Sequence, residues 1–104
     1  MRSLYISLAV LVLGSVAAIR AAEPVEIVID HYAFAPEEIS VRKGETVRWI
    51  NRDSVPHVVA VGEVSSPVLA PGESFEWTFA RAGSVTYGCP LHPRMVARFT
   101  VEEN

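Results

Sequence analysis

Four side chains that could bind a soft metal ion stand out in this sequence. The stretch YGCPLHPRM, residues 87–95, contains the only cysteine of the chain, Cys89, followed at steps of three residues by His92 and Met95. The fourth side chain, His57, lies in an earlier stretch, PHVVAV. Nitrogen donors favour Cu(II) and sulfur donors favour Cu(I), so a thiolate, two imidazoles and a thioether suit a copper ion that changes its oxidation state. The pattern therefore points to copper redox chemistry.

Each of these residues has an ordinary explanation when it is considered alone. A single cysteine is most often a small buried apolar residue, a histidine such as His57 is more often a core or loop residue than a ligand, and Met95 could simply fill space in a core. An unpaired thiol in an exported protein is nevertheless exposed to oxidation, and binding to a metal would protect it. The combination of four donors is therefore more informative than any one of them.

The first 22 residues have the composition of a secretory signal peptide. A basic residue, Arg2, precedes an apolar run over residues 4–19, and small residues follow. A membrane anchor is the alternative, but a spanning helix needs about 20 apolar residues and Arg20 interrupts this run. We expect cleavage after one of three small residues, Ala18, Ala21 or Ala22. The remaining domain, residues 23–104, is then exported without stable membrane insertion, to the periplasm if the source is bacterial.

The charge of this domain argues against a nucleic-acid partner. The chain has nine basic and twelve acidic residues, and two of the basic ones, Arg2 and Arg20, precede residue 23. The rest of the chain therefore carries a net charge of −5, whereas nucleic-acid binding needs a basic surface. A chain of 104 residues has room for one small domain. We expect this domain to be a monomer.

Apolar residues recur at every second position along most of the domain, which is the period of β-strands. The alternating positions are Val25, Ile27, Ile29, Val47, Trp49, His57, Val59, Val61, Phe75, Trp77, Phe79, Val85, Tyr87, Cys89, Met95, Ala97, Phe99 and Val101. Turn residues separate these segments, and we expect residues 62–72 to form a loop that crosses between sheets. Short strands at this spacing predict an all-β domain, either an antiparallel sandwich or a small barrel.

The alternation also predicts the direction of the candidate ligands. Cys89 has the parity of Tyr87, and His57 has the parity of Val59, so both should emerge from the buried faces of their strands. Both residues lie near strand ends. We therefore expect the donors to meet at one end of the sandwich.

The residues around the candidate ligands resemble a known family. YGCPLHPRM followed by VARFTVEE resembles the C-terminal copper loop of the small blue-copper proteins, the cupredoxins, and VRKGETVRWINRDSVPHVV resembles their N-terminal half. The short Cys-x-x-His-x-x-Met spacing is similar to that of amicyanin, whereas plastocyanin and azurin have longer loops. The resemblance covers about residues 25–102. It implies an antiparallel Greek-key β-sandwich that binds one copper ion through His57, Cys89, His92 and, as a weak axial ligand, Met95.

The resemblance further implies a carrier of single electrons between proteins, with no enzymatic activity. His92 shares its loop with apolar residues and is expected to reach the surface within an apolar patch, where a redox partner could approach the metal. Such complexes are transient and have small interfaces, below about 1,200 Å². Similarity to amicyanin suggests a dehydrogenase as electron donor and a c-type cytochrome as acceptor. Arg94 is expected to be either a solvated charge or a group that steers an acidic partner.

Two features depart from the family pattern. Cupredoxins usually have an asparagine directly after the first ligand histidine, where its side chain ties the two ligand loops together, but this chain has Val58. The substitution removes this side-chain hydrogen bond, which influences the rigidity of the loops and the reduction potential. The chain after residue 22 is also short for the family. His31 matches no ligand position and is expected to be a solvated loop residue.

Three other classes of site could use some of the same residues. A module for copper storage, delivery or resistance could use all four donors, but the chain lacks a Met-rich or His-rich tail. A structural zinc site would have little use for a thioether and would be expected to contain a second cysteine. A catalytic Cys-His pair would need an oxyanion donor and an acidic group to orient the histidine, and neither is evident.

Overall fold

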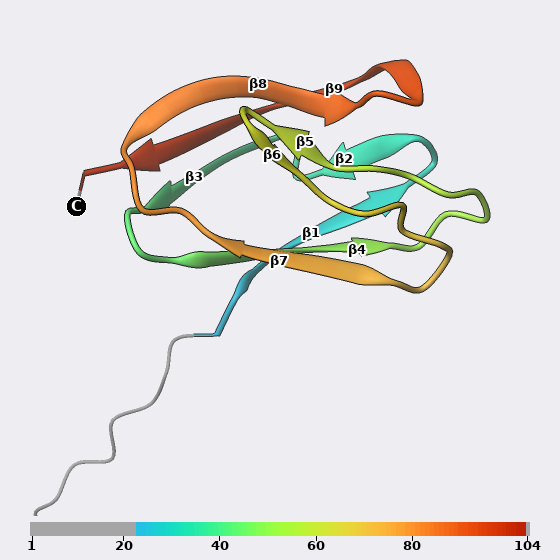
Figure 1. Ribbon diagram of the computed structural model, residues 1–104, viewed down its shortest axis with the longest axis horizontal. Coiled ribbons are helices and arrows are strands. Elements are labelled where there is room, and N and C mark those ends of the chain that lie inside the picture. The colour runs from blue at the N-terminus through green and yellow to red at the C-terminus, as the bar shows by residue number, and fades with distance from the viewer. Residues whose placement is uncertain (1–22, 104) are drawn as a thin grey trace, which may run out of the picture.

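The computed structural model describes residues 23–103, which form nine β-strands and no helix. The strands are β1 (Val25–Asp30), β2 (Ala33–Ala35), β3 (Glu38–Arg42), β4 (Thr46–Asn51), β5 (Ala60–Val61), β6 (Val64–Ser65), β7 (Ser74–Thr78), β8 (Gly83–Cys89) and β9 (His92–Glu102). They make two sheets that lie face to face (Figure 1). The predicted signal peptide, residues 1–22, lies outside the described residues. Residues 23–103 contain no helix that is long and apolar enough to cross a membrane.

The strand orders of the two sheets are β2-β1-β4-β7 and β3-β9-β8-β5-β6. The chain crosses from one sheet to the other after β2, β3, β4, β6 and β7, so its connections wrap around a shared core. The predicted β-sandwich is confirmed. Its sheets are mixed rather than wholly antiparallel, because β1 pairs with β4 and β3 pairs with β9 in parallel. A strand that returns to its sheet after a crossover can run in the same direction as its neighbour, which a tight hairpin does not allow.

The core between the sheets is built from the alternating apolar positions. Its buried side chains include Ile27, Ile29, Val47, Trp49, Val59, Val61, Tyr87, Ala97, Phe99 and Val101. Trp49 is fully buried, and its ring stacks on that of Phe99 with the centroids 6.1 Å apart. The indole N–H of Trp49 donates a hydrogen bond of 3.2 Å to the hydroxyl of Tyr87. Burial raises the pKa of Tyr87 to about 12 against the opposite effect of this hydrogen bond, so the phenol is neutral at ordinary pH.

Three details differ from the expectations. Trp77 has the parity of a buried residue but is 44% exposed, because β7 is an edge strand, and its ring stacks on Phe75 instead. Residues 62–72, expected to be a loop, include the short edge strand β6. The strand expected from His57 onward begins only at Ala60, because His57 pairs separately with Leu69.

Four connections meet at one end of the sandwich, on the right in Figure 1. They are the β1–β2 turn, the β4–β5 segment, the β6–β7 segment and the β8–β9 turn. Backbone hydrogen bonds fix two of them to each other, because the His57 N–H donates to the Leu69 carbonyl and the Leu69 N–H donates to the His57 carbonyl. This end of the molecule contains the candidate metal ligands.

Candidate metal centre

The turn between β8 and β9 brings Cys89 and His92 together. Cys89 ends β8, His92 begins β9, and the two residues are paired across the hairpin. The register shifts between Gly88 and Cys89, at a point where the backbone of Gly88 lies against the Met95 carbonyl, leaving no room for a Cβ atom. This tight approach sets the Cys89 side chain beside the His92 ring. The Cys89 Sγ and His92 Nδ1 atoms are 3.6 Å apart.

His57 reaches the same place from the β4–β5 segment. Its side chain is fully buried, and the N–H of the next residue, Val58, donates a hydrogen bond of 3.3 Å to Cys89 Sγ. The possible ligand atoms of His57, Cys89 and His92 all lie within 4.8 Å of one another. Donors from distant parts of the chain therefore converge as the strand parity predicts.

Met95 lies at the same end of the molecule, on the strand that begins with His92. It is only 3% exposed and lines two hollows of the surface, one together with His92 and the other together with Cys89. Its position three residues into β9 follows from the strand alternation, which turns Met95 and Ala97 inward and leaves Val96 half exposed. All four donors predicted from the sequence thus lie at the same end of the core.

A carboxylate determines which nitrogen of His57 is available. The Nε2 atom of His57 lies 2.8 Å from the Oδ2 atom of Asp53, so this nitrogen carries the proton and donates. The other ring nitrogen, Nδ1, is buried and has no hydrogen-bond partner among residues 23–103. A buried polar atom without a partner is costly unless another group satisfies it. Nδ1 of His57 is therefore suited to bind a metal ion.

Asp53 is itself held as a carboxylate. Burial by itself raises the pKa of Asp53, but the hydrogen bonds from the Tyr32 N–H, the His57 ring and the His31 N–H outweigh it, so the pKa lies below its ordinary value. Asp53 is ionised at neutral pH and accepts a hydrogen bond from the Nε2–H group of His57. This arrangement of a carboxylate behind a histidine is common behind metal ligands, where it fixes the tautomer of the ring.

The donor set fits copper better than zinc. The cluster contains one thiol, because Cys89 is the only cysteine of the chain, together with two imidazoles and a buried thioether nearby. Structural zinc sites use four thiolate or imidazole ligands and have little use for a thioether, whereas copper in electron-transfer sites is bound by His₂Cys with a weak Met.

Comparisons with known proteins agree with this geometry. The family model described as "Cupredoxin-like domain" matches residues 3–101. Amicyanin of Paracoccus denitrificans is 36% identical over 72 residues, a match that spans 62% of this chain and 55% of that protein. A purple cupredoxin from Nitrosopumilus maritimus superposes with a TM-score of 0.71 and 31% identity, covering 75% of this chain and 99% of that one. The chain belongs to the cupredoxin-like domain family. The cofactor of this cupredoxin is accordingly one copper ion, in agreement with the donor set.

The same fold occurs within a larger enzyme. The copper-containing nitrite reductase of Thermus scotoductus superposes on 86% of this cupredoxin with a TM-score of 0.77 and 26% identity. The superposed part is 24% of the nitrite reductase chain. The likeness therefore concerns one domain of that chain.

Asn51 supplies a tie between loops that sequence reasoning missed. Its buried side-chain N–H₂ donates to the carbonyls of Val55 and Leu69 at 2.9 and 2.8 Å, and its Oδ1 atom accepts from the Asp53 N–H at 2.9 Å. This cupredoxin has no asparagine at position 58, where Val58 contributes a backbone contact to Cys89 instead. Through these hydrogen bonds, Asn51 ties the β4–β5 segment, which contains His57, to Leu69 in the β6–β7 segment.

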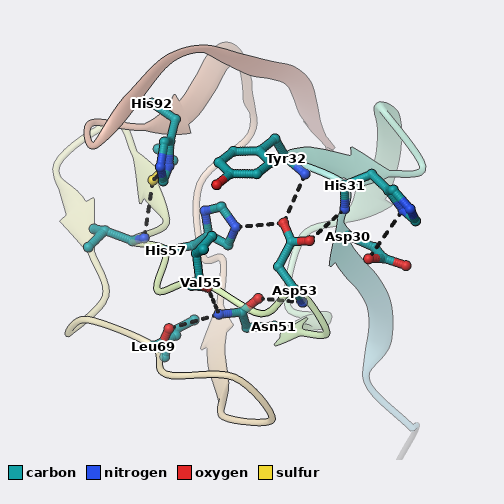
Figure 2. A network of polar contacts seen from close by, with 11 residues as sticks. Asp30, His31, Tyr32, Asn51, Asp53, Val55, His57, Leu69 and His92 are labelled. Carbon is teal, nitrogen blue, oxygen red and sulfur yellow. Dashed lines mark hydrogen bonds and ion pairs between the residues drawn. The ribbon is translucent and has the colours of Figure 1, made fainter.

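Asp53 and Tyr32 are two further site residues that the sequence did not reveal. Both lie in turns. Turn propensity alone explains an aspartate in NRDSVP, and nothing in the sequence around Tyr32 indicates a place at the site. The structure places the Tyr32 ring against both histidine rings (Figure 2). His31, by contrast, has a side chain that is 91% exposed, as expected for a solvated loop residue.

The surface around His92 is largely apolar, as expected. His92 is partly buried, Leu91 is 53% exposed, and Pro90 and Pro93 are also exposed. A shallow hollow of about 390 Å³ beside the ring is lined by Tyr32, His92, Pro93, Arg94 and Met95. Arg94 is exposed, and among residues 23–103 it forms no ion pair.

Proposed function

We propose that this cupredoxin is a mononuclear blue-copper electron carrier that binds copper through His57, Cys89, His92 and, weakly, Met95. The main support for the proposal is that the Nδ1 atom of His57 has no hydrogen-bond partner among residues 23–103. It is buried, its ring is fixed by Asp53 from the other side, and it belongs to a group of donors within 4.8 Å of one another. Copper, when bound there, supplies one-electron redox chemistry between Cu(II) and Cu(I).

The burial of the donors supports a carrier rather than an enzyme. His57 and Cys89 are almost fully buried, so they offer little surface on which a substrate could reach a bound metal ion directly. The partly buried ring of His92 is the donor nearest to the apolar surface, so a partner that docks there approaches the site through this ring. A small apolar contact allows the partners to separate after each transfer.

The proposal extends to the location and partners of the protein. Residues 1–22 act as a signal peptide, residues 23–104 form the exported domain, and the domain works as a monomer outside the cytoplasm. Its partners are transient redox proteins. Similarity to amicyanin favours a dehydrogenase as donor and a c-type cytochrome as acceptor, and the free charge of Arg94 suits a partner with acidic groups around its docking site.

Absorption and electron spin resonance of the copper-loaded protein test this function. Cu(II) should give an intense visible band from charge transfer between thiolate and copper, and Cys89→Ser should abolish it. The copper should remain bound through repeated reduction and oxidation in the presence of a competing chelator. A colourless complex that readily gives its copper to the chelator would instead indicate a copper-delivery module.

A further inference from the structure

Tyr32 occupies a backbone conformation that a tyrosine rarely adopts. The turn between β1 and β2 consists of His31 and Tyr32 alone, because Asp30 pairs directly with Ala33. Both turn residues have positive φ angles, 52° for His31 and 58° for Tyr32. Two-residue hairpin turns of this kind strongly favour asparagine and glycine, since a residue with a large side chain is strained at positive φ. Other contacts must therefore hold this turn in place.

Asp53 provides these contacts. Its Oδ1 atom accepts a hydrogen bond of 2.8 Å from the His31 N–H, and its Oδ2 atom accepts one of 2.8 Å from the Tyr32 N–H. The same Oδ2 atom also lies 2.8 Å from His57 Nε2. Figure 2 shows this carboxylate between the turn and the His57 ring. One side chain therefore fixes both the turn and a histidine of the metal centre.

The Tyr32 ring is aimed at the metal centre. Its centroid lies 4.8 Å from that of His92 and 5.5 Å from that of His57, and it is perpendicular to both rings, at 89° in each case. Perpendicular packing at these distances is a favourable arrangement of aromatic rings. Tyr32 nevertheless remains 50% exposed, and together with His92 it lines a hollow of the surface. A strained turn thus holds an exposed aromatic ring over both imidazoles.

We propose that Tyr32 is a positioning residue of the metal centre, which covers the histidine rings on the solvent side and slows the loss of copper. The proposal rests on the ligand assignment made above. A histidine that releases copper has to turn its ring away from the ion, and the perpendicular contacts of Tyr32 oppose that rotation at both rings. The ring also limits the approach of water and chelators between His57 and His92.

Two single substitutions, one at each turn residue, separate the effect of the Tyr32 ring from the effect of the turn conformation. Tyr32→Gly and His31→Gly relieve the same kind of backbone strain, but only the first removes a ring that contacts His57 and His92. Transfer of Cu(I) from the protein to excess bathocuproine disulfonate should be about tenfold faster for Tyr32→Gly. His31→Gly should remain within about twofold of the wild type. Tyr32→Phe, which keeps the ring, should do the same.

The metal-free protein offers a second readout that does not depend on copper. The imidazole C–H resonances of His57 and His92 should shift in Tyr32→Gly, because the ring current of the phenol is lost, and should stay in place in His31→Gly. Equal acceleration of copper transfer in the two glycine variants, or equal imidazole shifts, would overturn the role of Tyr32. If the wild-type protein does not bind copper, the ligand assignment is wrong, and the proposed effect on copper loss is wrong with it. The imidazole resonances would still show whether the Tyr32 ring packs against His57 and His92.

Discussion

Asp53 is the residue on which the site depends most, although it is not one of the four donors. Its carboxylate fixes the tautomer and orientation of His57, and in doing so leaves Nδ1 of that ring as the free nitrogen. Its pKa is lowered by the hydrogen bonds that it accepts, so the carboxylate stays charged to a lower pH than an ordinary aspartate. Interactions behind a metal ligand of this kind usually change metal affinity by about 10- to 100-fold when they are lost.

Asp53→Ala should therefore weaken copper binding by about 10- to 100-fold. The measurement is competition for copper against a chelator of known affinity. Asp30→Ala is the matched control, because Asp30 is a carboxylate next to the same turn and, among residues 23–103, its side chain pairs only with the exposed side chain of His31. Equal losses of affinity in both variants would mean that general charge, and not the orientation of His57, controls binding.

Among the elements of the fold, the β8–β9 hairpin determines the geometry of the site. It contains Cys89, His92 and Met95, and its register shift lies directly before Cys89. Gly88 is required there because a Cβ atom would overlap the Met95 carbonyl oxygen. A substitution at this glycine has to push apart the two strands that contain three of the donors.

Gly88→Ala should lower the free energy of unfolding by about 1–3 kcal/mol, as overpacking usually does, and should also weaken copper binding. Denaturant unfolding of the metal-free protein and chelator competition measure the two effects. Gly83→Ala lies at the other end of β8, where the φ angle of 152° makes alanine strained but no atom lies near the added methyl group. It should destabilise the fold while leaving copper affinity unchanged. Intact affinity in Gly88→Ala would contradict the importance of the close approach.

The strands and the donors were predictable to different extents. Alternation predicted β1, β4, β8 and β9, together with the inward direction of Cys89, because these strands cover the core with one face. The three-residue strand β2 is too short for a period to appear, and β3 has only Ile39 and Val41 to indicate one. The parallel pairings depend on how distant strands assemble, so local pattern does not encode them.

The supporting residues of the site were not predictable from the sequence. Asn51 and Asp53 look like ordinary turn residues in NRDSVP, and their roles appear only when the β4–β5 segment meets the β1–β2 turn and Leu69. Tyr32 gives no signal either, because its contact with His57 and His92 depends on an unusual backbone conformation. The side-chain chemistry of the sequence identifies the possible donors, whereas the residues that orient these donors can be recognised only from the tertiary structure.

At the scale of the whole molecule, one aromatic core connects the two sheets below the site. Trp49 is fully buried at its centre and contacts the rings of Phe75, Phe79, Tyr87 and Phe99. Tyr87 belongs to the same strand as Cys89, two positions earlier, so the packing around Trp49 supports the strand that presents the thiol. Stability of the sandwich and placement of the donors are therefore linked.

Trp49→Ala should lower the free energy of unfolding by about 3–5 kcal/mol, because it removes a large side chain that is fully buried. Denaturant unfolding of the metal-free protein is the measurement. Trp77→Ala provides the comparison, since Trp77 is 44% exposed on an edge strand and should cost much less. Similar costs for the two tryptophans would mean that the assignment of the sheet faces is wrong.

A crystal structure of the copper-loaded protein is the most direct test of the central claim. We expect one copper ion bound by Cys89 Sγ, His57 Nδ1 and His92 Nδ1, next to the sulfur of Met95, with the hydrogen bond between His57 Nε2 and Asp53 preserved. Copper bound elsewhere, or a site in which His57 stays unbound while Cys89 and His92 hold the ion, would contradict it.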